Sequence, residues 1–254
     1  MGFEMNNRGQ IMIFVAIAIV IVVAIGLFFL IDKKPEILRQ GSDNPESFID
    51  GCVKKATLKV IDEMLPRGGF VNPIDYKIYE NEKVAYLCKN IRHYEPCVNQ
   101  YPRLIIKLQE ELNEEVKKDV EECFASLDNE LTNKNYEVSG GGVSVETTFR
   151  PEIVEAKINR DFSIIKGDVV RNFESFNVFV KSDAYNLVYI ASEIVDQEAE
   201  FCHFSNNGFM ALYPSYDIRK TLFGDSTNIY SIINKKTGEK MNLAIRGCVI
   251  PAGI

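Results

Sequence analysis

The chain has 254 residues and is acidic, with 36 aspartate and glutamate residues, 29 lysine and arginine residues and a formal net charge of −7. This balance argues against nucleic acid or an anionic membrane surface as a partner, because both require a basic face. Two histidines are too few for a histidine-rich metal site, and no cofactor is expected. The length and the 46% hydrophobic content are sufficient for a sizeable core.

Residues 11–31 are an unbroken apolar run, IMIFVAIAIVIVVAIGLFFLI. At a rise of about 1.5 Å per residue this run gives a helix of about 31 Å, which matches the hydrocarbon core of a bilayer. A secretory signal peptide has a shorter apolar core followed by a small-residue cleavage site, and no such site follows here. The sequence therefore predicts a transmembrane helix over residues 10–31 that stays attached to the mature chain.

Arg8, Gly9 and Gln10 stand directly before the apolar run. This motif and its position resemble the class III signal peptide of archaeal type IV pilin-like proteins, over residues 8–31. In that family a prepilin-type peptidase cuts after the glycine on the cytoplasmic side, which implies a leader of residues 1–9 and a mature chain that starts at Gln10. The resemblance also implies a helix that anchors the protein in the lipid bilayer and packs against copies of itself or other pilin-like subunits.

Two positions depart from the family's pattern. Phe14 stands at the fifth mature position, where many members carry a glutamate, and Met12 stands at the third, where a serine is common. Phe14 offers no carboxylate to a neighbouring subunit's amino terminus, so the sequence leaves filament assembly open. The alternative is an uncleaved signal anchor in which the Arg-Gly-Gln sequence has no function.

Six cysteines follow the apolar run, an even number that fits disulfides in an oxidising exterior. No Cys-x-x-Cys occurs, which argues against a zinc ribbon or a thioredoxin-like redox site. We expect a single-pass protein of the cell membrane, with its N-terminus in the cytoplasm and its C-terminal domain outside the cell. The alternative for cysteines on helical stripes is that they are buried small hydrophobes. The expected disulfides are Cys52–Cys123, Cys88–Cys97 and Cys202–Cys248.

The region after the apolar run divides into a polar linker over residues 32–44, a helix-rich part over 45–139 and a sheet-rich part over 140–254. Asn44 stands at an N-cap and Pro45 at a first helical position, so a helix is predicted over 45–65. A second, longer helix is predicted over 104–131 from a stripe of apolar residues at helical spacing. That stripe consists of Leu104, Leu108, Leu112, Val116, Val120, Cys123, Phe124, Leu127 and Leu131.

Alternating residues after Gly140–Gly142 predict strands, and Asp183 is expected to cap a third helix whose apolar stripe extends to Phe201 and Cys202. A hairpin is also expected over 76–89, with its turn at Asn81–Glu82. Strands mixed with separate helices are typical of an α+β fold with antiparallel sheet, preceded here by the single transmembrane helix. The further expected strands are 143–150, 153–158, 162–165, 169–180, 228–233 and 240–246.

No catalytic constellation can be assembled from the sequence. Cys202 and His203 are adjacent on a predicted helix and point about 100° apart, so they do not form a nucleophile–base pair. We therefore expect no enzyme, and no catalytic, cofactor-binding or metal-binding residues. The favoured interpretation is a membrane-anchored, outward-facing pilin-like surface protein with a structural or adhesive role. The alternative is a monomeric, membrane-tethered extracytoplasmic binding module without catalytic activity, whose ligand contacts the loops at 67–75 and 91–102.

Overall fold

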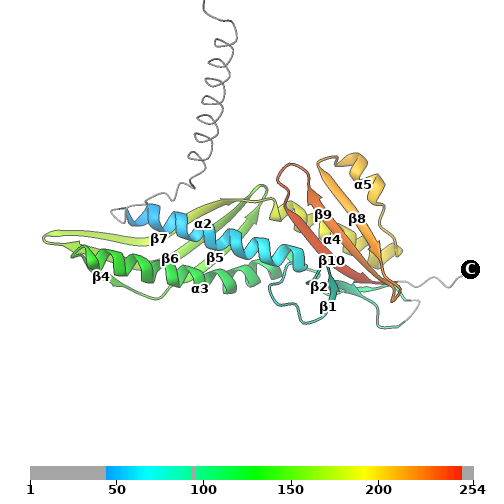
Figure 1. Ribbon diagram of the computed structural model, residues 1–254, viewed down its shortest axis with the longest axis horizontal. Coiled ribbons are helices and arrows are strands. Elements are labelled where there is room, and N and C mark those ends of the chain that lie inside the picture. The colour runs from blue at the N-terminus through cyan, green and yellow to red at the C-terminus, as the bar shows by residue number, and fades with distance from the viewer. Residues whose placement is uncertain (1–43, 93–94, 248–254) are drawn as a thin grey trace, which may run out of the picture. The chain divides into compact units, whose positions relative to one another are not determined.

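The computed structural model describes residues 44–92 and 95–247, and these residues form an α+β fold (Figure 1). They belong to one compact unit, in which helices and strands from both sides of the glycine run at 140–142 pack together. The expected leader and transmembrane helix, and the expected linker except for Asn44, lie outside the described residues. Within the described part, no helix has both the length and the apolar character needed to cross a membrane.

Helix α2 (Pro45–Met64) begins as the sequence predicts. The Asn44 side chain accepts a hydrogen bond from the Glu46 amide at 3.2 Å, and Pro45 occupies the first helical position. The chain continues into the short helix η1 (Leu65–Arg67) and turns at Gly68, whose φ is +83°. A Cβ at Gly68 would lie 2.9 Å from the Cβ of Ala85, so this turn requires glycine both for its backbone conformation and for space.

Helix α3 (Leu104–Asn133) packs against α2 along its length. Its buried residues are the nine that the apolar stripe predicts, and the charged residues between them face solvent. Phe124 of α3 is buried, with its ring 5.8 Å from that of Phe162 and 5.5 Å from that of Phe176. The two helices therefore share one core with the strands that carry these phenylalanines.

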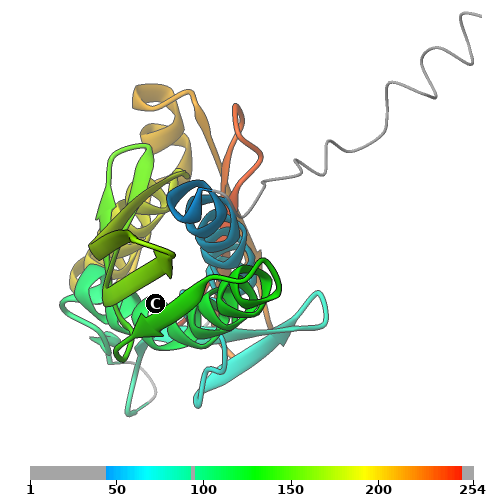
Figure 2. The ribbon, with the colours of Figure 1, turned by 90° about the vertical axis from the view of Figure 1, so that its left-hand side faces the viewer.

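The first sheet is antiparallel and is built around one long strand, β6. Along one side β6 pairs with β7 over its whole length, and along the other side it pairs first with β5 and then with β4. Seen from the end where β6 turns into β7, α2 and α3 lie side by side against one face of this sheet (Figure 2). The strands are β4 (Glu137–Gly140), β5 (Ser144–Arg150), β6 (Ile153–Lys166) and β7 (Val169–Lys181).

Strand β6 corrects one sequence expectation. The sequence predicts two strands, 153–158 and 162–165, whereas the structure has one strand with an irregularity in its pairing with β7 between Asn159 and Phe162. The extra residue of this bulge shifts the alternation of side chains, which gives the appearance of a break in the sequence pattern.

The second sheet has the strand order β1-β2-β10-β9-β8, with β3 paired to β2. Its pairings are antiparallel except for β2 with β10, which are parallel. The sequence predicts antiparallel sheet, but β2 and β10 come from distant parts of the domain, so no hairpin fixes their relative direction. The strands are β1 (Tyr76–Tyr79), β2 (Glu82–Lys89), β3 (Val98–Asn99), β8 (Tyr216–Leu222), β9 (Thr227–Asn234) and β10 (Lys240–Arg246).

The hairpin between β1 and β2 turns one residue earlier than expected. Glu80 and Asn81 form the turn, with φ values of +50° and +67°, instead of Asn81 and Glu82. Two consecutive positive φ angles are the mark of the turn that matches the right-handed twist of a hairpin. Asparagine tolerates a positive φ well, so Asn81 suits this turn, and Glu80 occupies the other turn position.

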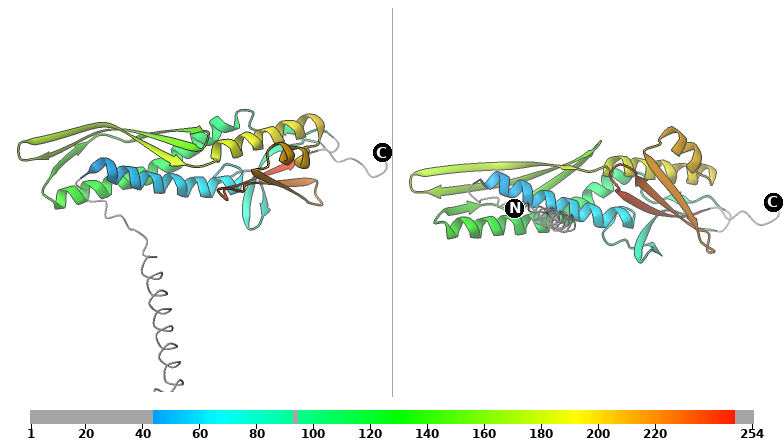
Figure 3. Two further views of the ribbon diagram at one scale, coloured as in Figure 1. Left: turned by 90° about the horizontal axis from the view of Figure 1, so that it is seen from above. Right: turned by 45° about the horizontal axis from the view of Figure 1, so that its top comes forward.

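Helix α4 (Ala184–Phe201) packs against β10, β9 and β2 of the second sheet and also contacts α3 and β6 (Figure 3). The expected stripe is buried as far as Val195, but Phe201, the last helical residue, is 65% exposed. The next buried position is occupied by Glu198, a residue that hydropathy assigns to the surface. The short helix α5 (Asn206–Leu212) follows and lies next to β8.

Candidate functional site

Two of the three expected disulfides are present. Cys52 of α2 is bonded to Cys123 of α3, and Cys88 at the end of β2 is bonded to Cys97 just before β3. The third expected pair, Cys202–Cys248, includes Cys248, which lies outside the described residues. The expected processing motif, Arg8, Gly9 and Gln10, also lies outside them.

The described residues present no thiol nucleophile and no metal centre. None of the described cysteines is free, which removes Cys202 and His203 as a catalytic pair. Within 44–92 and 95–247, no group of three or more histidine, cysteine, aspartate or glutamate side chains is arranged to hold a metal ion.

In the loops that the sequence offers as a ligand site, the described aromatic residues Phe70 and Tyr101 pack against each other. Phe70 is 7% exposed, and its ring lies 4.8 Å from that of Tyr101. Arg67 ties the first loop to the fold, because its guanidinium donates to Glu63, Glu82 and the carbonyl of Val71. In the described part of these loops, the aromatic side chains therefore serve the packing of the domain.

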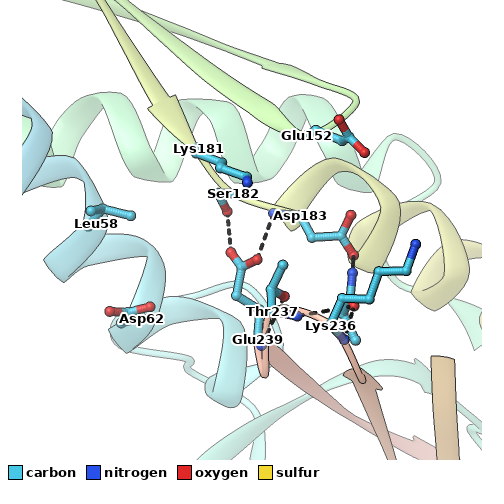
Figure 4. Close-up of a pocket in the computed structure, with 10 residues that line it drawn as sticks. Leu58, Asp62, Glu152, Lys181, Ser182, Asp183, Lys236, Thr237 and Glu239 are labelled. Atoms are coloured by element: carbon cyan, nitrogen blue, oxygen red, sulfur yellow. Dashed lines mark hydrogen bonds between the residues drawn. The ribbon is translucent and has the colours of Figure 1, made fainter. Parts of the chain in front are cut away.

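A cleft lies elsewhere, where four separate segments converge (Figure 4). It has a volume of about 460 Å³, within the range of small-molecule sites. Helix α2, the turn between β5 and β6, the end of β7 and the turn between β9 and β10 each contribute to its wall. The lining residues are Leu58, Asp62, Glu152, Lys181, Ser182, Asp183, Asn234, Lys236, Thr237 and Glu239.

One wall of the cleft is fixed by Glu239. Its carboxylate accepts hydrogen bonds from the Ser182 hydroxyl at 2.5 Å and from the Asp183 amide at 2.8 Å. The Ser182 hydroxyl in turn accepts from the amide of Ala184 at 3.1 Å, in the first turn of α4. The turn between β9 and β10 is thus held firmly against the start of α4.

Asp183 is nearly buried and occupies the N-cap position of α4, but its side chain does not cap the helix as the sequence predicts. Its carboxylate accepts instead from the Asn234 amide at 2.7 Å, the Asn186 amide at 2.6 Å and the Tyr216 hydroxyl at 3.0 Å. Burial and the hydrogen bond to Asp183 raise the pKa of Tyr216, so this hydroxyl remains a donor at neutral pH. Asp183 is therefore a structural centre with its hydrogen-bonding capacity used.

The other charged groups of the cleft have no such partners. Among the described residues, the side chains of Asp62, Glu152, Lys181 and Lys236 take part in no hydrogen bond or ion pair. Partial burial, followed by the nearby charge of Glu239, raises the pKa of Asp62. The cleft thus combines a rigid wall with two carboxylates and two ammonium groups that are available to a ligand.

A second group of titratable side chains lies in the core and not in the cleft. Glu198 is 3% exposed and accepts hydrogen bonds from the Tyr230 hydroxyl and, at 2.9 Å, from the Lys220 ammonium. Burial and the adjacent Glu198 carboxylate raise the pKa of Tyr230. Because these three groups satisfy one another, their role is to join α4 to β8 and β9.

The geometry therefore favours the cleft as the candidate site. Of the carboxylates that line it, Asp183 is engaged in three hydrogen bonds, whereas those of Asp62 and Glu152 are available to a ligand. No protein-family model, curated protein or solved structure matches this chain.

Proposed function

We propose that this chain is a membrane-anchored, outward-facing pilin-like surface protein with a structural or adhesive role. The observation that carries the proposal is the pair of disulfides in the domain that follows the apolar run. Disulfides persist in oxidising compartments and are rare in a reducing cytosol. They support a domain on the outer side of the membrane, and hence a cytoplasmic N-terminus.

The proposed role is physical. The apolar helix over residues 10–31 anchors the protein in the bilayer and offers a surface for lateral packing with copies of itself or other pilin-like subunits. A prepilin-type peptidase removes residues 1–9 by cutting between Gly9 and Gln10. Phe14 provides no carboxylate for the amino terminus of a neighbouring subunit, so assembly into a filament stays open. The helix anchors the protein in either case.

The test is mass spectrometry of the N-terminus of protein extracted from its native membrane. A mature chain that starts at Gln10 is expected, and a G9V variant is expected to keep Met1 because the peptidase requires the glycine. The matched control is N7A, which should be processed normally because Asn7 stands just before the Arg8–Gln10 motif and is not part of it. An intact Met1 in the unsubstituted protein, or a start beyond Ile31, would contradict the proposal.

The location of the domain is tested separately with a membrane-impermeant maleimide. In intact cells, the cysteines should be labelled only after treatment with a reductant, because the described cysteines are not free thiols and the domain lies outside. Labelling that requires lysis of the cells would place the domain on the inner side. This outcome would contradict the proposed orientation even if the leader is cleaved.

The second candidate function is a monomeric, membrane-tethered binding module, and the cleft in Figure 4 is the observation that favours it. This site differs from the loops that the sequence suggests, because Phe70 and Tyr101 of those loops pack against each other. Size measurement of the extracted protein distinguishes the two functions: a monomer that binds a ligand supports the module, and a higher assembly supports the pilin-like role.

A further inference from the structure

We propose that the cleft between α2, the β5–β6 turn, the end of β7 and the β9–β10 turn binds a small zwitterionic molecule of the amino-acid or short-peptide class. Lys181 and Lys236 receive its carboxylate, and Asp62 and Glu152 receive its ammonium group. This inference goes beyond the proposed surface role and is independent of the membrane anchor.

The two lysines of the cleft, Lys181 and Lys236, stand out among the described lysines because their ammonium groups have no partner. Most lysines in the described part of the chain have a carboxylate, a carbonyl or an aromatic ring as partner. The ammonium groups of four described lysines have none, and two of those four line this cleft. The four are Lys55, Lys157, Lys181 and Lys236.

Two carboxylates of the cleft, those of Asp62 and Glu152, also have no partner among the described residues. Figure 4 shows Asp62 on helix α2, across the cleft from Lys236 on the β9–β10 turn. Glu152 approaches from the β5–β6 turn. These opposite charges line the same cleft without pairing with one another, so a ligand that carries both charges finds partners of each sign there.

The backbone at Glu152 is a third, independent observation. This residue follows Pro151 in the turn between β5 and β6 and has a φ of +65°. Turn positions with positive φ favour glycine or asparagine, and a glutamate there is strained. Glu152 places a carboxylate at the cleft. A glycine or an asparagine at this position would relieve the strain but would carry no carboxylate.

The size and the wall of the cleft limit the ligand. A volume of about 460 Å³ accommodates an amino acid or a dipeptide but leaves little room for a large cofactor. Leu58 adds an apolar surface that suits a small aliphatic side chain. The contacts of Glu239 with Ser182 and Asp183 keep the wall preformed, so binding does not require these groups to be reordered.

The test uses isothermal titration calorimetry on the full chain in detergent, with L-alanyl-L-alanine and L-glutamine as probes. Saturable binding in the millimolar range or tighter is expected for at least one probe. N-acetyl-L-alanyl-L-alanine lacks the ammonium group and L-alanyl-L-alaninamide lacks the carboxylate. If the dipeptide is the probe that binds, each derivative should bind about tenfold more weakly, because each loses one charge-assisted contact.

Three variants complete the test. K236Q and D62N should each weaken binding about tenfold, since each removes one free charge of the cleft. K157Q is the matched control, because Lys157 also lacks a partner but lies outside the cleft, and its affinity should equal that of the unsubstituted protein. Circular dichroism of each variant establishes that it is folded.

Three results would overturn the proposal: no saturable binding of either probe, equal binding of a probe and its singly charged derivatives, or an equal loss in K157Q and K236Q. Each of these results leaves the N-terminal mass spectrometry unaffected. Failure of the ligand proposal is therefore distinguishable from failure of the proposed surface role.

Discussion

Tyr230 illustrates how one buried side chain sets a pH dependence for the whole domain. Its ring is fully buried and its hydroxyl donates to the Glu198 carboxylate, and both conditions disfavour the phenolate. The pKa of Tyr230 is raised mainly by burial, and the same cause leads for Tyr216 and Tyr101. These three tyrosines stay protonated in the folded state at pH values where an unfolded chain ionises them.

We predict that the free energy of unfolding falls steeply as the pH rises above about 10, the value at which an unfolded tyrosine ionises. The stability that each raised pKa contributes is fully present below that pH and is lost above it, at about 1.4 kcal/mol per pH unit per tyrosine. Urea titrations across this pH range measure the slope. Y230F should reduce the slope by the share of one tyrosine.

The control for this prediction is Y189F, which removes a tyrosine that is 60% exposed. Its slope should equal that of the unsubstituted protein. A Y230F variant with an unchanged alkaline slope would show that Tyr230 does not stay protonated in the folded state. The lower stability expected of Y230F at neutral pH, from the lost hydrogen bond, does not affect this comparison because the slope is measured and not the absolute value.

The backbone conformation of Glu152 should lower the stability of the folded domain. Because its φ is +65°, E152G should raise the free energy of unfolding by about 0.5–1 kcal/mol, after allowance for the greater freedom of glycine in the unfolded chain. E152Q keeps the strain and should change stability by less than about 0.5 kcal/mol. Chemical denaturation checks both values, and a destabilised E152G would contradict the strain argument. Both variants lose the carboxylate, so both should bind the zwitterionic probe more weakly.

The two disulfides stabilise the domain to different extents. Cys52–Cys123 closes a sequence separation of 71 residues between α2 and α3, and Cys88–Cys97 closes one of 9 residues beside β3. Chain-entropy arguments give about 4 kcal/mol for the first and about 2.5 kcal/mol for the second. We predict this order for the double variants C52A/C123A and C88A/C97A in urea unfolding. The reverse order would show that the unfolded-state entropy does not dominate.

The helices are the elements most accessible from sequence. Helix α2 carries its start in Asn44 and Pro45, and the nine-residue stripe of α3 is buried as predicted, because both depend on local spacing and capping. Elements that depend on distant partners are harder to predict. The sequence pattern does not indicate β4, β8 or α5, and Phe201, which the stripe predicts to be buried, is exposed.

The candidate site is even harder to predict from the sequence than these elements, because it too depends on residues that are distant in the chain. Its charged residues lie on four segments between Leu58 and Glu239, each of which has the composition of an ordinary polar turn or helix surface. Spacing along the chain cannot show that Lys181 and Lys236 share a cleft, because the fold alone brings β7 and the β9–β10 turn together. The unusual positive φ of Glu152 is likewise invisible in its sequence.

For the molecule as a whole, the two sheets should differ in how they open. Strands β2, β9 and β10 lie inside the second sheet, with a partner on either side, whereas β7 pairs with β6 alone among the described strands. We predict that amides of β9 and β10 exchange with solvent only through global unfolding, and that the outward-facing amides of residues 169–175 in β7 exchange by local opening. Hydrogen-exchange mass spectrometry with pepsin measures both. Equal protection of β9 and β10 and of residues 169–175 would contradict the predicted difference between the two sheets.

The parallel pairing of β2 with β10 also affects the order in which the domain can form. Strand β10 is the last described strand in the chain, yet it lies between β2 and β9 and supplies a neighbour to each. A chain that emerges from a ribosome or a membrane channel therefore cannot complete this sheet until residues 240–246 have arrived. Until then, β2 and β9 each expose an unpaired edge to other chains. Assembly of the sheet is consequently a late event with a high contact order, and an interrupted chain is prone to aggregation.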